Sequence, residues 1–138
     1  MKKILIIGGS GFVGSSLIKY LDNYQVINFD KNKSPFFPKI TKIGNILDVN
    51  KMENVFNNID CVVLLAAEHR DDVNPSSKYY DVNVQGTKNV LKLMTKYKVN
   101  KIIFTSSVAV YGLNKKFPNE SSNTDPFNHY GKSKLQAE

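Results

Sequence analysis

Residues 3–14 read KILIIGGSGFVG, an apolar, β-branched run followed at once by glycines spaced three residues apart. Gly8 permits a tight turn, Gly11 lets backbone amides approach a pyrophosphate, and Gly14 permits close packing of a helix on a strand. The N–H groups that start such a helix also favour a bound anion. Because the glycines follow a predicted strand and open a predicted helix, the pattern predicts a dinucleotide-binding turn rather than a purely structural one.

Short apolar runs alternate with helical patterns along the rest of the chain. Strands are expected at 3–7, 26–29, 40–43, 60–66 and 101–107, and helices near 12–23, 50–58, 76–97 and 130–138. Strands that are apolar on both faces and joined by helices predict a parallel sheet with helices on both sides, the doubly wound α/β (Rossmann-type) fold. No repeat or internal linker interrupts this order, so residues 1–138 are expected to form one domain.

Composition narrows the possible functions. With 138 residues, 41% of them hydrophobic, the chain is long enough for a substantial core. No run approaches the roughly 20 apolar residues of a membrane span, and the first apolar run is too short for a signal peptide, so we expect a cytoplasmic protein with no membrane partner. The net charge of +7 comes from scattered lysines with Arg70 as the one arginine, which argues against a nucleic-acid partner. Cys61 lies in an apolar run with no second cysteine in the chain, so we expect a buried thiol and no metal site.

Asp30 ends the second predicted strand, 19 residues after Gly11. A carboxylate at this point can accept hydrogen bonds from the adenosine ribose and repels a 2′-phosphate, which favours NAD over NADP. Two alternatives stay open: Lys31 and Lys33 follow directly and could attract a phosphate, and Asp30 could be an ordinary loop carboxylate.

Two further motifs accompany the glycine turn: FTSSVAVYG at 104–112 and YGKSK at 130–134. With all three, the sequence resembles the extended short-chain dehydrogenase/reductase family, the NAD-dependent nucleotide-sugar epimerases and dehydratases, and most closely its sugar-nucleotide 4-epimerases. The resemblance covers the whole chain in order. Members of this family are much longer, so the resemblance implies the N-terminal part only, truncated before a C-terminal substrate-binding domain.

The resemblance assigns catalysis to Ser107, Tyr130 and Lys134. A phenol whose pKa is near its ordinary value of about 10 is a poor base at neutral pH. Lys134, one helical turn after Tyr130, and the positive nicotinamide ring would both favour the phenolate. Ser107, expected at the end of the fifth strand, would hydrogen-bond the same sugar oxygen. A Tyr-x-x-x-Lys spacing also arises by chance on surface helices, and residues 105–107 could be only a polar strand end.

The resemblance also implies a set of cofactor-binding positions. They are Gly8, Ser10, Gly11, Phe12, Val13, Gly14, Asp30, Asn45, Ile46, Ala66, Ala67, Asn83, Tyr130 and Lys134. Asn45 stands where many relatives have Asp, and its amide carbonyl could still accept from the adenine amino group. Asn83 and Gly86 fall within a long helical pattern, where Gly costs about 1 kcal/mol relative to Ala, so a local interaction should offset the cost. Asn83 is expected in the polar wall beside the cofactor, and an unremarkable helix face is the alternative.

Val108 and Ala109 bear on the type of reaction. The dehydratases and decarboxylases of the family carry acidic residues at one or both of these positions, and neither side chain here can ionise. An epimerase or a simple ketoreductase is therefore favoured over a dehydratase.

Two functional hypotheses follow. In the first, the chain is the N-terminal cofactor-binding part of an NAD-dependent nucleotide-sugar epimerase, in which Tyr130 removes a hydroxyl proton while hydride passes to NAD. In the second, it is a non-catalytic dinucleotide-binding module or an interaction subunit. We expect the 138 residues alone to be inactive, because the nucleotide-sugar site is largely missing. Relatives commonly dimerise through the helices that carry Asn83 and Tyr130, so a homodimer is possible.

Overall fold

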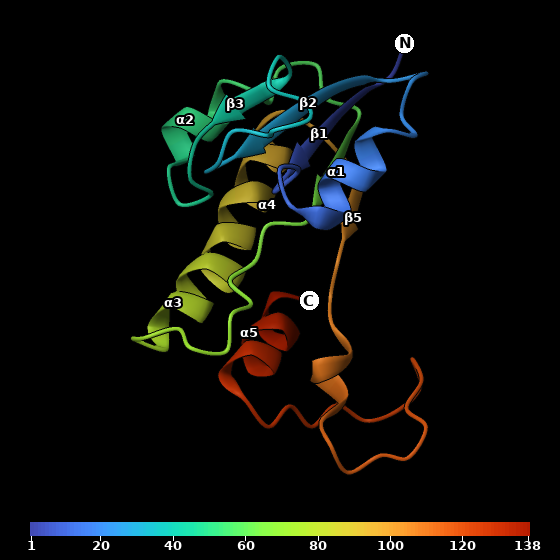
Figure 1. Ribbon diagram of the computed structural model, residues 1–138, viewed down its shortest axis with the longest axis vertical. Helices are drawn as coiled ribbons and strands as arrows, with labels where there is room; N and C mark the ends of the chain where they lie inside the picture. The colour runs from blue at the N-terminus through green and yellow to red at the C-terminus, as the bar shows by residue number, and fades with distance from the viewer.

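The computed structural model describes all residues from 1 to 138 and contains a five-stranded parallel sheet (Figure 1). The strands are β1 (Lys3–Ile7), β2 (Gln25–Asp30), β3 (Thr41–Ile43), β4 (Cys61–Leu64) and β5 (Ile102–Phe104). Their order is β3-β2-β1-β4-β5, and every neighbouring pair is parallel. The predicted doubly wound, Rossmann-type fold is confirmed, and the strand order reverses between β1 and β4, where such sheets bind ligands.

Helical segments connect the strands. They are α1 (Phe12–Ile18), α2 (Val49–Glu53), α3 (Ser77–Tyr80), the π-helix η1 (Asp81–Gln85), α4 (Gly86–Lys96), the 3-10 helix η2 (Val108–Tyr111) and α5 (His129–Ala137). None of these helices is both long and apolar enough to span a membrane.

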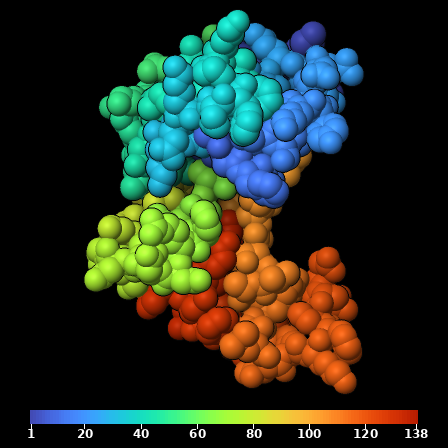
Figure 2. Space-filling view, viewed as in Figure 1, coloured from blue at the N-terminus to red at the C-terminus, as the bar shows by residue number.

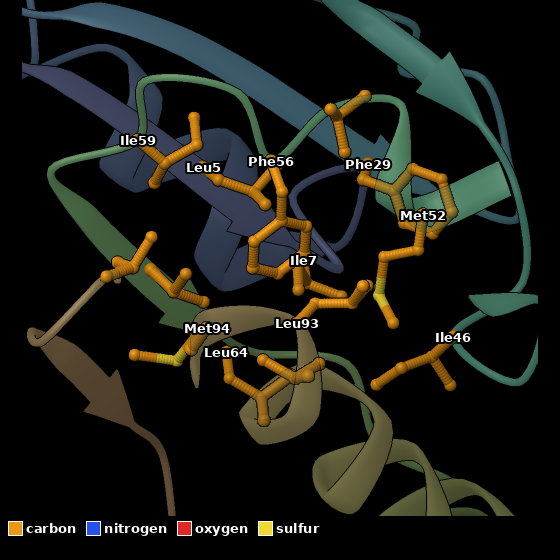
Figure 3. Packing of buried hydrophobic residues seen from close by; sticks show 14 residues of the cluster. Leu5, Ile7, Phe29, Ile46, Met52, Phe56, Ile59, Leu64, Leu93 and Met94 are labelled. Atoms are coloured by element: carbon orange, nitrogen blue, oxygen red, sulfur yellow. The ribbon is translucent and has the colours of Figure 1, made fainter. Parts of the chain in front are cut away.

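The two faces of the sheet have separate apolar cores. Leu5 and Ile7 of β1 pack with Met52 of α2 and Leu93 of α4 in the larger cluster (Figure 3). The intervening residues of β1 face the opposite side, where Ile18 of α1 covers them. Because side chains alternate along a strand, four consecutive buried residues supply both cores, and each fully buried aliphatic side chain contributes about 1.5–3 kcal/mol.

Several elements are shorter than the sequence predicts. The helix predicted at 12–23 ends at Ile18, after which the Tyr20 and Leu21 amides bond only three residues back, to Leu17 and Ile18, in tighter turns. The helix predicted near 50–58 ends at Glu53. The strand predicted at 101–107 ends at Phe104, since its partner β4 ends opposite it at Leu64.

The helix predicted at 76–97 is a continuous column of three segments, α3, η1 and α4. The wider π-turn lies where the sequence places Asn83, and such turns often occur at functional sites. Gly86 starts α4, and a Cβ there would lie 2.9 Å from Ile46 Cγ2. The missing side chain therefore lets α4 approach Ile46 closely, which offsets the low helix propensity of glycine.

Helix α5 lies beside the α3–η1 end of this column, away from the sheet (Figure 1). Asn128 caps it by accepting a hydrogen bond from the Gly131 amide at 2.7 Å. The segment between η2 and α5 projects from the body of the molecule (Figure 2). A helix this short needs packing, and η1 and η2 supply it.

Candidate functional site

A groove of about 390 Å³ lies at the carboxyl ends of β1, β2 and β4. It is lined by the glycine loop and by the segments that follow β2, β3 and β4. Eight predicted cofactor-binding residues line it: Gly8, Ser10, Gly11, Asp30, Asn45, Ile46, Ala66 and Ala67. The fold thus brings together in one groove residues spread over nearly 60 positions of the sequence.

The glycine loop is packed tightly on one side and open on the other. Gly8 has φ of +91°, and a Cβ there would lie 2.4 Å from the Ala66 nitrogen. A Cβ on Gly14 would lie 2.4 Å from Gly9 Cα, whereas one on Gly11 would find no atom nearer than 3.7 Å. Gly8 and Gly14 are therefore required by packing within the chain, and Gly11 keeps the groove side of the loop clear.

Backbone amides are available where the loop enters α1. The N–H groups of Phe12, Val13 and Gly14 donate to no acceptor in the chain. The Ser15 amide, bonded to the Gly11 carbonyl at 2.9 Å, starts the helical ladder. These three amides can bind an anion such as a pyrophosphate.

Asp30 is half-buried and fixes the turn after β2. Its carboxylate oxygens accept from the Ser10 amide at 3.0 Å and the Asn32 amide at 2.8 Å. Each oxygen retains a further lone pair, so Asp30 can accept another hydrogen bond from a group in the groove.

Asn45 and Ile46 form the wall that follows β3. The side-chain oxygen of Asn45 accepts from the Leu47 amide at 2.9 Å, so it closes a local turn and has one lone pair left for a ligand. Ile46 is 6% exposed and packs against Gly86 of α4. This wall is therefore set by the contact between α4 and the loop.

Asn83, expected in the polar wall beside the cofactor, lies behind Glu68, which does line the groove. It is 2% exposed and does not line the groove. Its side-chain oxygen accepts from the Glu68 amide at 2.7 Å, and its amide nitrogen donates to the Glu68 carbonyl at 3.0 Å and to Ser133 Oγ at 2.8 Å. Asn83 therefore joins the loop after β4 to α5.

Tyr130 lies in the first turn of α5. It is half-buried, its ring is 6.5 Å from that of Tyr79, and its hydroxyl makes no hydrogen bond within the chain. Ser107 precedes η2, and its Oγ accepts from the Ala109 amide at 3.2 Å, which leaves its own O–H able to donate. Both hydroxyl groups are thus available to a substrate.

Lys134 is 2% exposed, and its ammonium group contacts Phe104, the last residue of β5, and Thr105, which follows it. Its Nζ donates to the Thr105 carbonyl at 2.6 Å and lies 4.1 Å from the centre of the Phe104 ring. Burial lowers the pKa of the ammonium group to about 8. No hydrogen bond joins Lys134 to Tyr130.

Ser107, Tyr130 and Lys134 are outside the lining of the groove. The structure therefore has two parts: a groove built by β1 to β4, and the polar side chains of Ser107 before η2 and of Tyr130 and Lys134 on α5. Asn83 connects the two parts through Glu68 and Ser133. No local pattern in the sequence predicts the contacts of Ser133, Glu68 and Asn28, because the side-chain bonds concerned join residues at least 13 positions apart.

Comparison with known proteins agrees with this geometry. Residues 4–138 match the family described as NAD dependent epimerase/dehydratase. The N-acetyl-alpha-D-glucosaminyl-diphospho-ditrans,octacis-undecaprenol 4-epimerase of Escherichia coli O157:H7 is 58% identical over 98% of this chain.

Solved structures resemble the chain over nearly all of its length. The UDP-glucose 4-epimerase of Brucella ovis in complex with NAD has a TM-score of 0.90 and 30% identity over 99% of the chain. The UDP-glucose 4-epimerase of Bifidobacterium longum in complex with NAD+ and UDP has a TM-score of 0.87 and 34% identity. The chain covers 41% of the E. coli protein and 46% and 47% of the two structures, so it matches less than half of each relative.

Proposed function

The chain belongs to the NAD dependent epimerase/dehydratase family, and we propose that it is the N-terminal, NAD-binding part of a sugar 4-epimerase. The observation that carries the proposal is the groove: eight predicted cofactor residues line it, at the strand ends where this fold binds dinucleotides.

The residues present fit NAD. The three amides that follow Gly11 suit the pyrophosphate, and the bare Gly11 backbone leaves room for it to approach. Asp30 suits the adenosine ribose and opposes a 2′-phosphate. When bound, NAD supplies the acceptor for a hydride removed from the sugar.

Three side chains outside the groove suit the proton chemistry. Tyr130, whose side-chain oxygen has no partner in the chain, acts as the base in its phenolate form: the phenolate oxygen takes the proton of the sugar hydroxyl and becomes the neutral phenol. Ser107 donates to the same sugar oxygen and orients it. Lys134, charged at neutral pH because its pKa of about 8 lies above it, favours the phenolate through its positive charge.

The proposed substrate is a sugar joined through a diphosphate to a carrier. The structural relatives act, by their names, on UDP-glucose, whereas the E. coli relative acts on a sugar diphosphate of undecaprenol. Its 58% identity, against 30% and 34% for the two structures, favours the polyisoprenol carrier and an N-acetylated sugar.

The first test is a titration of the 138-residue chain with NAD and separately with NADP, followed by thermal unfolding. A saturable rise in melting temperature with NAD, weaker with NADP, is expected because a ligand that binds only the native state stabilises it. A second arm fuses the chain to the C-terminal segment of the E. coli relative and assays 4-epimerisation of N-acetylglucosamine on undecaprenyl diphosphate and on UDP. Failure to bind NAD rejects the cofactor site. Conversion of the UDP-sugar but not of the undecaprenyl diphosphate sugar rejects the lipid carrier.

A non-catalytic dinucleotide-binding module is the second candidate. It is favoured by the separation of the groove from Ser107, Tyr130 and Lys134. The variant Tyr130→Phe distinguishes the two candidates. In an epimerase it abolishes turnover, whereas a module has no turnover to lose and keeps its NAD affinity. A homodimer and a cytoplasmic location stay predictions.

A further inference from the structure

Asn28 is a buried polar residue on β2, between β3 and the central strand β1. It lies in the middle of β2 with an exposed fraction of 0%. Parallel strands covered on both faces usually carry apolar residues at such positions, because a buried amide is costly unless its hydrogen bonds are satisfied. A local interaction must therefore justify the asparagine.

Every hydrogen-bonding group of the Asn28 side chain has a partner in the loop or the neighbouring strand. Oδ1 accepts from the Gly9 amide at 2.9 Å, and Nδ2 donates to Ser10 Oγ at 3.0 Å and to Thr41 Oγ1 at 2.9 Å. Because Ser10 Oγ accepts from Asn28, its own proton is directed to the Asn32 carbonyl, 2.7 Å away. A single side chain thus fixes two successive residues of the glycine loop.

These contacts divide the loop into two parts. The amides of Gly9 and Ser10 are used internally, by Asn28 and Asp30. The amides of Phe12 and Val13 are left for a ligand. The fit is close, since a Cβ on Gly9 would lie 2.5 Å from Asn28 Oδ1.

We propose that Asn28 is a positioning residue of the dinucleotide site, which holds the glycine loop in its binding conformation before the cofactor arrives. The inference rests on the cofactor part of the proposed function. A loop ordered in advance spares the cofactor the cost of ordering it, so the side chain raises affinity without touching the ligand.

The test compares Asn28→Val with Thr41→Val in NAD titrations of the folded chain by calorimetry. Valine suits a buried strand and removes all three side-chain bonds of Asn28. Thr41→Val removes the one Asn28 bond that does not reach the loop, together with the bond that Thr41 Oγ1 donates to the Phe37 carbonyl. It is therefore a control for the loss of buried polar contacts in which both bonds from Asn28 to the loop are kept. The dissociation constant for NAD should rise about tenfold or more in Asn28→Val and stay within about twofold of wild type in Thr41→Val. Equal affinities in Asn28→Val and wild type overturn the proposal.

Amide hydrogen exchange on the wild-type chain without NAD gives a second test that needs no variant. The Gly9 amide should be protected and the Phe12 and Val13 amides should exchange quickly, because only the first has an acceptor. A Gly9 amide that exchanges as fast as that of Val13 overturns the proposal even if Asn28→Val fails to fold. If the Gly9 amide is protected but the chain binds no NAD, the hydrogen bond between Gly9 and Asn28 is confirmed. The proposed function is then rejected, and with it the role of that bond in cofactor binding.

Discussion

Gly14→Ala and Gly11→Ala should separate the two roles of the glycine motif. The Gly14 Cβ would lie 2.4 Å from Gly9 Cα and 2.7 Å from both its carbonyl carbon and oxygen. Carbon atoms pack at roughly 3.5–4.0 Å, so backbone, which cannot rotate aside, would have to move by about 1 Å. Overpacking of this kind costs about 1–3 kcal/mol, and we expect the upper end.

Part of this cost is recovered because Ala is a better helix former than Gly by about 1 kcal/mol. The net loss in the free energy of unfolding is therefore about 2 kcal/mol, or about 8 °C in melting temperature at roughly 4 °C per kcal/mol for this chain length. Gly11→Ala places its Cβ no nearer than 3.7 Å to any atom, and its φ of −77° is open to alanine. It should cost only about 0.5 kcal/mol, as a weaker helix cap.

The assay is urea and thermal unfolding of both variants without ligand, followed by titration with NAD. We expect Gly14→Ala to lose stability, and Gly11→Ala to keep it while its NAD affinity falls about tenfold, because the new methyl group stands in the groove. Equal stability of Gly14→Ala and wild type, or an equal loss in both variants, would refute the packing argument.

Two further predictions concern the polar group around α5. Burial lowers the pKa of Lys134 from 10.5 to about 8, so between these pH values the unfolded chain binds more protons than the folded chain. The free energy of unfolding of the wild type should therefore rise from pH 8 to pH 10.5, relative to that of Lys134→Met. Urea unfolding across this range checks the sign, and parallel pH profiles of the two proteins would contradict it. Ser133→Ala removes one bond of Asn83 and the bond from Ser133 Oγ to the Tyr130 carbonyl, and should cost about 1 kcal/mol with faster amide exchange in α5. Asn83→Ala leaves the Glu68 amide and carbonyl without partners and should cost about 1–3 kcal/mol more. Unfolding energies that are the same for both variants would show that the Glu68 contacts contribute nothing.

The general fold was predictable because its signals are local. The β1 run followed by Gly8, Gly11 and Gly14 encodes a strand, a turn and a helix within 12 residues. Element ends were predicted less well, since they depend on neighbours: β5 ends where β4 no longer offers a partner at Leu64.

The candidate site divides in the same way. Gly8, Gly11 and Asp30 were identifiable from spacing along the chain, and the structure places all three in the groove. The sequence also marked Asn83 as an unusual helical residue that needed a local interaction, but not that this interaction is with Glu68 and Ser133.

Sequence alone was therefore sufficient for the order of strands and helices and for the glycine turn, because backbone conformation and apolar periodicity are properties of neighbouring residues. The bonds of Asn28 to the glycine loop, and the burial of Lys134 against Phe104 and Thr105, follow only from how the folded chain brings distant segments together. A hydrogen bond or a pKa depends on atoms a few ångströms away in space, and the atoms that bond Asn28 to the loop and Lys134 to Thr105 come from residues 18 to 29 positions distant in the sequence.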